Sequence, residues 1–327
     1  MPIDQGRAFE YACISALNEA ITRAGQNPTI NRDSSFEIAE QNFNLLADEN
    51  REHAEDLRKA ASKVSETLLK TEPKLNTAED SFRELTLSIQ PDTAGMSGDV
   101  RDVIVIKAST GNQDNWEIGL SCKHNHQAVK HQRVSPTIDF GDIWLGFPLS
   151  QDEKLELNRI FGQIDNEIAG GKIKWSEVET KEDRYYIPIL NLILGKIGNH
   201  PEQSQLANHF LGYLIGKKDF YKAIYRQAKG TVQIQGFNLY GSLNKPAGSR
   251  RPEQNINRIN LPERIIGCGI KPGSKTTLEI FFDRGWQVSM RVHNASTRLE
   301  KSLKMDVGLI GNPQELFSFT HTLNDNQ

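Results

Sequence analysis

The sequence predicts a mixed α/β fold, and three observations lead to this class. A segment with helical spacing of apolar residues opens the chain, strand-like segments follow from about residue 83, and strand-like patterns return after residue 231. The 327 residues, 37% of them hydrophobic and 25% charged, suffice for one large or two fused domains. We therefore expect a core with the order helix, three strands, helix, strand.

The helices come first. Residues 6–25 carry apolar side chains at helical spacing, among them Phe9 and Cys13, and Glu10 lies one position off this stripe. Residues 34–72 form a polar and acidic stretch with an inner seam of alanine, leucine and valine. We interpret this stretch as a helical insertion.

Three strands follow the helices. Residues 83–90 alternate between apolar and polar side chains, and residues 102–107 form a short continuous apolar run that is typical of a buried central strand. Residues 115–123 make the next strand, joined to the previous one through a turn at Gly111–Asn112. The two strands are expected to pair as a hairpin.

The predicted core closes with residues 124–133, which lack a β-branched run and read as a helix, and with a strand over residues 143–148. We expect three regions: the core with its helical insertion over residues 1–149, a helical region over 150–230 and a β-rich region over 231–327. This last region holds 12 Lys and Arg against 8 Asp and Glu. A mildly basic tail favours a polyanionic partner, although solvated lysines alone also produce such a balance.

The composition also excludes several classes of protein. No apolar run approaches the ~18 residues that a membrane span needs, and no signal peptide opens the chain. The three cysteines, Cys13, Cys122 and Cys268, lie far apart and in no spacing typical of disulfides or metal ligands. We therefore expect a protein of the reducing cytoplasm with no membrane partner.

Acidic and basic side chains meet at the ends of the two hairpin strands. Pairing about the turn places Asp102 opposite Ser121 or a neighbour, with Lys123 one pleat further on the same face. A carboxylate that holds a divalent ion, beside a lysine that positions or helps to deprotonate water, is what metal-assisted phosphodiester hydrolysis requires. The pattern therefore indicates a nuclease site, although each residue alone also fits a turn or a solvated strand end.

An acidic residue that opens an apolar strand, followed by a carboxylate-x-lysine pattern at the end of the next strand, resembles the PD-(D/E)XK nucleases. Their core order matches the predicted one, and in many of them a glutamate on the first helix is linked to the metal, where this chain has Glu10. The segments "GDVRD", "WEIGLS", "FNLYGSLN" and "GWQVSMRVHNAST" are more specific. Together they resemble the HaeIII-type restriction endonucleases over nearly the whole chain.

This resemblance implies cleavage of double-stranded DNA at GGCC with Mg²⁺, and a cognate DNA methyltransferase as functional partner. One position departs from the pattern, because Ser121 stands where a carboxylate is expected, and a neutral hydroxyl is a poor ligand for a hard dication. Glu117 lies about 13 Å along the strand, too far to replace it. We therefore expect catalytic roles for Asp102, Lys123, Asp99 and Ser121, and metal ligands from Asp102, Glu10, Asp99 and the backbone carbonyl of Cys122, with Asp139 as a further candidate.

Two groups of basic and amide side chains are candidates for DNA contacts. The first is the predicted basic helix, which carries His124, Asn125, His126, Lys130, His131 and Arg133. A zinc site there lacks a cysteine pair, and the contiguous His-Asn-His tripeptide does not match the spacing of a His-Asn-His nuclease. The second group would read bases, because arginine donates well to guanine. It comprises Arg291, His293 and Asn294 on a strand and Asn244, Lys245, Arg250 and Arg251 on a long loop.

The resulting hypothesis is a type II restriction endonuclease that uses Mg²⁺-activated water, with residues 1–149 as its catalytic core and the β-rich residues 231–327 as its DNA-recognition region. A palindromic target favours a twofold homodimer, with a monomer that cuts the strands in turn as the alternative. Two other functions remain open at this level. One is a structure-directed nuclease of DNA repair or recombination, and the other is a DNA-binding regulator without catalytic activity, which Ser121 in place of a carboxylate would favour.

Overall fold

The computed structural model describes residues 3–77, 82–91, 99–109, 115–125, 128–198 and 203–323. The chain forms two compact units, each built from separate stretches of sequence. Unit 1 comprises residues 1–127, 218–259 and 315–327, and unit 2 comprises residues 128–217 and 260–314. The changes of unit do not coincide with residues 150 and 231, where the sequence suggested boundaries.

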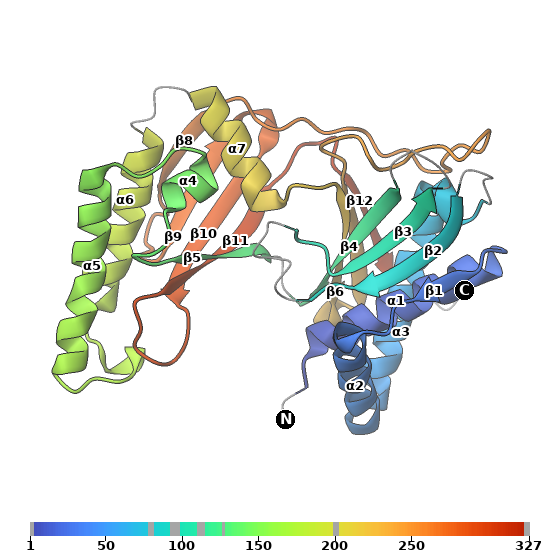
Figure 1. The fold of residues 1–327 in the computed structure, drawn as a ribbon, viewed down its shortest axis with the longest axis horizontal. Helices are drawn as coiled ribbons and strands as arrows, with labels where there is room; N and C mark the ends of the chain where they lie inside the picture. Colours follow the sequence, from blue (N-terminus) through green and yellow to red (C-terminus); the bar gives the residue numbers. More distant parts are fainter. Residues whose placement is uncertain are drawn as a thin grey trace. The chain divides into compact units, whose positions relative to one another are not determined.

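Unit 1 is built on a mixed sheet of seven strands (Figure 1). The strands run in the order β1 (Pro28–Ile30), β2 (Phe82–Ile89), β3 (Val103–Ser109), β4 (Trp116–His124), β6 (Phe220–Arg226), β7 (Thr231–Phe237) and β12 (Phe317–Thr322). The pairs β2–β3, β3–β4, β6–β7 and β7–β12 are antiparallel, whereas β1–β2 and β4–β6 are parallel. A parallel pair requires a crossover, and between β4 and β6 the chain builds a large part of unit 2.

Three helices pack on one face of this sheet. They are α1 (Gln5–Arg23), α2 (Ser34–Glu49) and α3 (Arg51–Thr71), and Asp4, Asp33 and Asn50 cap their N-termini through their side chains. Phe9, Cys13 and Leu57 from the helices join strand residues such as Leu120 and Tyr221 in one buried core. The predicted helices over 6–25 and 34–72 are confirmed.

The strand face turned away from these helices holds the polar positions. In β4 the residues Ile118, Leu120 and Cys122 belong to the helix-covered core, so the alternation of a strand turns Ser121 and Lys123 to the other face. The predicted strands over 83–90, 102–107 and 115–123 and their antiparallel pairing are confirmed, while the turn at Gly111–Asn112 lies outside the described residues.

Unit 2 is a five-stranded antiparallel sheet with helices on one face (Figure 1). Its strands run in the order β5 (Ala128–Val134), β11 (Leu303–Gly311), β10 (Gln287–Asn294), β9 (Thr277–Phe282) and β8 (Ile265–Ile270). The helices are α4 (Phe140–Leu145), α5 (Gln151–Ala169), α6 (Ile187–Gly198) and α7 (Gln203–Ile215). Alternate residues of the strands, such as Val288, Met290 and Val292, are buried, and the residues between them point away from this core.

Two of the predicted elements are wrong. The helix expected over 124–133 is instead the end of β4 and most of β5, because β5 pairs with β11, a partner about 170 residues away that local propensity cannot reveal. The strand expected over 143–148 is the end of α4 and a loop. There Phe140 and Trp144 are four residues apart and bury the same helical face. The mixed α/β class is confirmed.

No helix in the described part of the chain is long and apolar enough to cross a membrane.

Candidate active site

Asp102 is the centre of a compact polar cluster in unit 1. It immediately precedes β3, and its backbone N–H donates to the carbonyl of Leu120, which fixes its place opposite β4. Its Oδ2 atom accepts hydrogen bonds from the backbone N–H of Cys122 at 2.6 Å, from Lys123 Nζ at 3.2 Å and from Ser121 Oγ at 3.3 Å. The structure thus brings together Asp102, Ser121 and Lys123.

The charges of this cluster are complementary. Burial acts to lower the pKa of Lys123, but the charge of Asp102 and the hydrogen bond to it outweigh burial and raise that pKa. Lys123 is therefore a stable cation at neutral pH, which suits it to position a reactant and offset negative charge rather than to remove a proton. Within the described residues, Oδ1 of Asp102 has no hydrogen-bond donor, and 24% of the side chain is exposed.

Glu10 of α1 is a second carboxylate at this site. Burial, followed by the negative charge of Asp102, raises the pKa of Glu10 to about 8, and these effects outweigh the attraction of Arg7, whose Nη1 lies 2.7 Å from Glu10 Oε2. A buried carboxyl group whose pKa is raised by burial and by a neighbouring carboxylate favours a nearby cation. Glu10 therefore belongs electrostatically to the Asp102 cluster.

The donor set fits Mg²⁺. This ion commonly binds through one or two carboxylates and keeps several of its waters, and it prefers hard oxygen ligands. Such donors are supplied by Asp102, whose Oδ1 accepts no hydrogen bond within the described residues, and by Glu10, whose pKa is raised. Among the described residues, no group of three or more His, Cys, Asp or Glu side chains is placed to hold a metal ion.

Asp99 serves a different purpose from the one expected. Its Oδ1 and Oδ2 atoms bind Nε and Nη2 of Arg101 at 2.8 and 2.7 Å. Burial acts to raise the pKa of Asp99, but the hydrogen bonds and charge of Arg101 hold it below the usual range. Both carboxylate oxygens are thus engaged by an arginine, and the prediction that Asp99 assists as a catalytic group or metal ligand is not supported by its contacts. Asp139, the further candidate, caps α4 in unit 2 instead.

Comparison with known proteins agrees with this geometry. The family model for HaeIII restriction endonucleases matches residues 6–313. Type II restriction enzyme HaeIII of Haemophilus aegyptius is 41% identical over 312 residues, which are 95% of this chain and 94% of that enzyme. The chain belongs to the HaeIII restriction endonuclease family. The resemblance drawn from the sequence is confirmed, and with this membership the protein is a type II site-specific deoxyribonuclease.

In this HaeIII-family nuclease Cys122 connects the site to the core. Its backbone N–H holds Asp102, while its side chain is buried against the helices together with Cys13 of α1. Burial first, and then the neighbouring thiol of Cys13, raise the pKa of Cys122 well above its ordinary value. The thiol is therefore an apolar packing group and no nucleophile, as the strand alternation predicted.

His124 was predicted to contact phosphate from an exposed basic helix, but in this family member it is a buried strand residue. It is buried at the end of β4, where its Nε2 atom lies 3.1 Å from Nε2 of His53 on α3. Its ring also packs against Tyr225 of β6 at 5.4 Å between centroids. The exposed Asn125 accepts a hydrogen bond from the backbone N–H of Gln227. His126 and the side chains of Lys130 and His131 lie outside the described residues, and Arg133 of β5 is exposed and donates to Ser302.

The nuclease also places a residue near the site that the sequence did not single out. Lys222 of β6 is paired in register with Ser121 of β4. Only 2% of it is exposed, which is rare for a lysine. The single signal in the sequence is a lysine inside an otherwise apolar strand, "FYKAIYR", and this says nothing about its neighbours without the strand pairing.

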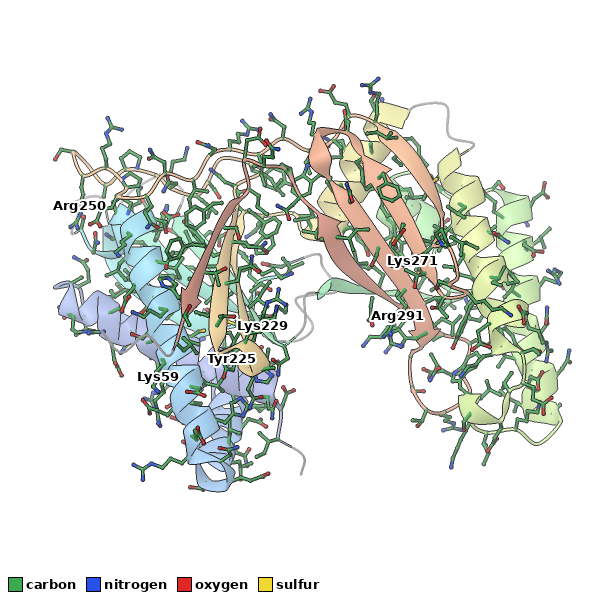
Figure 2. All side chains as sticks on the ribbon, turned by 180° about the vertical axis from the view of Figure 1, so that it is seen from behind. Lys59, Tyr225, Lys229, Arg250, Lys271 and Arg291 are labelled. Carbon is green, nitrogen blue, oxygen red and sulfur yellow. The ribbon has the colours of Figure 1, made fainter. Side chains whose placement is uncertain are left out.

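Arg291 and His293 lie on β10, on the strand face of unit 2 that points away from its core. Figure 2 labels Arg291. Both approach Asp306 of β11, with Arg291 Nη2 at 3.3 Å and His293 Nε2 at 3.1 Å from its oxygens. Arg291 nevertheless has a side chain that is 61% exposed. Asn294 is less available, because it accepts from Tyr186 and donates to the carbonyl of Ser296.

The long loop after β7 is held by Asn244, one of the predicted DNA contacts, whose side chain is engaged within the protein. Its amide donates to the carbonyls of Thr71 and Gln254 at 2.6 and 2.9 Å, and its Oδ1 accepts from the backbone N–H of Ile256. Its positive φ of 62° is one that asparagine tolerates. Lys245, Arg250 and Arg251 on the same loop are exposed.

Proposed function

We propose that this protein is a Mg²⁺-dependent type II restriction endonuclease that cleaves double-stranded DNA at GGCC. The observation that carries the proposal is the meeting of Asp102 and Lys123 on one polar sheet face, 3.2 Å apart, beside the second carboxylate of Glu10. GGCC is the target implied by the sequence segments shared with HaeIII-type enzymes.

Asp102 and Glu10 would hold the ion, and Mg²⁺, when bound, supplies positive charge for the phosphate and makes water more acidic. Cys122 fixes the orientation of Asp102 through its backbone N–H to Oδ2, so Oδ1 would be the oxygen left to hold the ion. Lys123, kept protonated by Asp102, orients the attacking water and offsets the charge that builds on the phosphate oxygens. Ser121 supports Asp102 through its hydroxyl instead of acting as a ligand.

For recognition, the proposal assigns base contacts to Arg291, because arginine donates in pairs to O6 and N7 of guanine. Two observations support this role: the Arg291 side chain is exposed, and it lies on the face of the unit 2 sheet that points away from the core. His293 and Arg133 are proposed as further contacts there, and Lys245, Arg250 and Arg251 as contacts to the phosphate backbone.

A palindromic target supports the further proposal that two copies act together about a twofold axis. A cognate methyltransferase would protect host DNA in the cytoplasm, where both proteins would meet their substrate. Sedimentation of the protein with and without a GGCC duplex would test the dimer, and a single copy per duplex at saturating DNA would refute it.

Digestion of a plasmid of known sequence tests the function directly. With Mg²⁺ we expect discrete fragments whose ends all fall in GGCC, and none with a chelator. A continuous smear would instead indicate a nuclease without sequence specificity. Retarded but uncut DNA would indicate a regulator without catalytic activity.

A further inference from the structure

Asp306 is an acidic residue on the sheet face of unit 2 that carries the proposed base contacts. In β11 it lies between Met305 and Val307, which are buried, so the alternation of the strand turns its side chain to the opposite face. The register of the sheet pairs it directly with Arg291 of β10. Because DNA phosphates repel a carboxylate, an acid at this position lowers the affinity for any DNA. Its contacts indicate what it contributes instead.

The carboxylate of Asp306 contacts two side chains of the neighbouring strand. Its Oδ2 atom accepts a hydrogen bond from Nη2 of Arg291 at 3.3 Å, and its Oδ1 atom lies 3.1 Å from Nε2 of His293. The Asp306 side chain is 25% exposed, whereas that of Arg291 is 61% exposed. The more buried acid is therefore the better-held member of the pair, and it restrains the end of a long and mostly exposed arginine.

This restraint affects how Arg291 can bind DNA. Ordering an exposed side chain with many rotamers costs free energy on binding, and a contact that orders it beforehand lowers that cost. A guanidinium has five N–H donors, so one hydrogen bond to Asp306 leaves donors for O6 and N7 of guanine. The same carboxylate offsets the positive charge of Arg291, which weakens its attraction for any phosphate. Both effects favour a guanine contact over a non-specific one.

We propose that Asp306 is a positioning residue for sequence recognition, which orients Arg291 toward guanine and reduces its attraction for DNA of other sequences. This inference rests on the proposed function, in which Arg291 contacts bases. Asp306 acts through the arginine, and the role requires no contact of its own with DNA. His293, beside the other carboxylate oxygen, limits the rotation of the carboxylate.

The test compares Asp306→Asn with Glu279→Gln as a matched control. Glu279 of β9 is paired with Ser289 and therefore lies on the same sheet face as Arg291, and its side chain is 18% exposed. Its partner is Lys271, which Figure 2 labels, at 3.1 Å. Each substitution removes one negative charge and keeps the shape of the side chain. Only the first removes the contact to Arg291.

Gel retardation in Ca²⁺ measures the affinity for a GGCC duplex and for an unrelated duplex. Both variants should bind the unrelated duplex more tightly than the wild type, because a carboxylate no longer faces the phosphates. In Glu279→Gln the affinity for GGCC should rise in proportion, so the ratio of the two affinities stays within about twofold of the wild type. In Asp306→Asn this ratio should fall about tenfold, since the arginine is no longer ordered. Equal ratios in the two variants would overturn the inference.

A double variant shows whether Asp306 acts through Arg291. Arg291→Ala removes the side chain that Asp306 would orient, so the addition of Asp306→Asn should lower the ratio of affinities by no more than about twofold further. A further tenfold loss in the double variant would mean that Asp306 acts independently of Arg291, which contradicts the proposed role.

The failure of this inference and that of the proposed function can be told apart. If the wild type binds both duplexes alike, the proposed recognition of GGCC fails. The order parameter of the Arg291 Nε–H group, measured by NMR without DNA, still decides on the positioning in that event. It should fall in Asp306→Asn and not in Glu279→Gln. An unchanged value in Asp306→Asn would refute the restraint of Arg291.

Discussion

The side chain of Arg101 lies directly over Gly119. A Cβ atom at residue 119 would stand 2.0 Å from Cδ and 2.6 Å from Cγ of Arg101, which is closer than any non-bonded contact permits. Arg101 is buried there, held by Asp99 at one side and by Glu117 at 3.3 Å at the other. Because Asp102 follows Arg101 in the chain, this packing positions the carboxylate that we propose as a metal ligand.

Gly119→Ala should therefore impair cleavage although residue 119 is no member of the site. The added methyl group forces Arg101 from its place, which we expect to cost about 1–3 kcal/mol of unfolding free energy and at least about tenfold in cleavage rate. Gly162→Ala in α5 is the control, because a Cβ there meets no atom within 4 Å, and it should be neutral or slightly stabilising. Chemical denaturation and single-turnover cleavage measure both effects, and equal behaviour of the two variants would contradict the role of Arg101.

A comparison of Asp99→Asn with Asp102→Asn should distinguish a structural role of the first residue from a catalytic role of the second. Asp99→Asn removes a charge partner of the buried Arg101, and we expect it to lose about 1–2 kcal/mol of stability but to keep measurable cleavage. Asp102→Asn should abolish cleavage at any Mg²⁺ concentration. The cleavage rates of both variants are measured over a range of Mg²⁺ concentrations. If Asp99→Asn had normal stability but no cleavage activity, Asp99 would be a metal ligand after all.

The stability of the metal-free protein should fall as pH rises through the range in which Glu10 titrates. The folded-state pKa of about 8 is higher than the unfolded value of 4.5, so the folded state retains a proton that the unfolded state has lost. The stabilisation from this proton is complete below pH 4.5 and is gone once the pH exceeds about 8. In a chelator at pH 8.5, Glu10→Gln should melt several degrees above the wild type, and it should not cleave DNA. A Glu10→Gln variant whose melting temperature follows pH as the wild type does would contradict this assignment.

Lys123→Ala should abolish cleavage and leave DNA binding nearly intact. Its ammonium acts on the reacting phosphate, and one phosphate contact among many contributes little to affinity. Gel retardation in Ca²⁺ measures DNA binding, and digestion in Mg²⁺ measures cleavage. If Lys123→Ala lost binding and cleavage in parallel, the lysine would be a docking residue and no part of the chemistry.

Arg291→Ala should weaken binding to a GGCC duplex by about 1–3 kcal/mol and binding to an unrelated duplex by much less. Arg264→Ala provides the control, since this arginine is also in unit 2 and is 78% exposed. It should change both affinities alike. An equal loss on both duplexes in Arg291→Ala would make Arg291 a phosphate contact.

The meeting of Asp102, Ser121 and Lys123 was predictable from the sequence. All three belong to neighbouring antiparallel strands that a short connection joins, so the period of two and the hairpin set their register locally. The helix of Glu10 was predictable for a similar reason, because its apolar stripe has the helical period within one segment.

Tertiary structure decided the partners that are remote in the chain. Residues 128–134 became β5 because β11 offers them hydrogen bonds, and Lys222 came to lie beside Ser121 because β6 pairs with β4 after a crossover of about 95 residues. Local propensity contains no information on such pairings, whose free energy comes from buried area and backbone hydrogen bonds between distant segments. The sequence alone therefore determined the acid and the lysine of this nuclease, and only the folded sheet determined which other charges surround them.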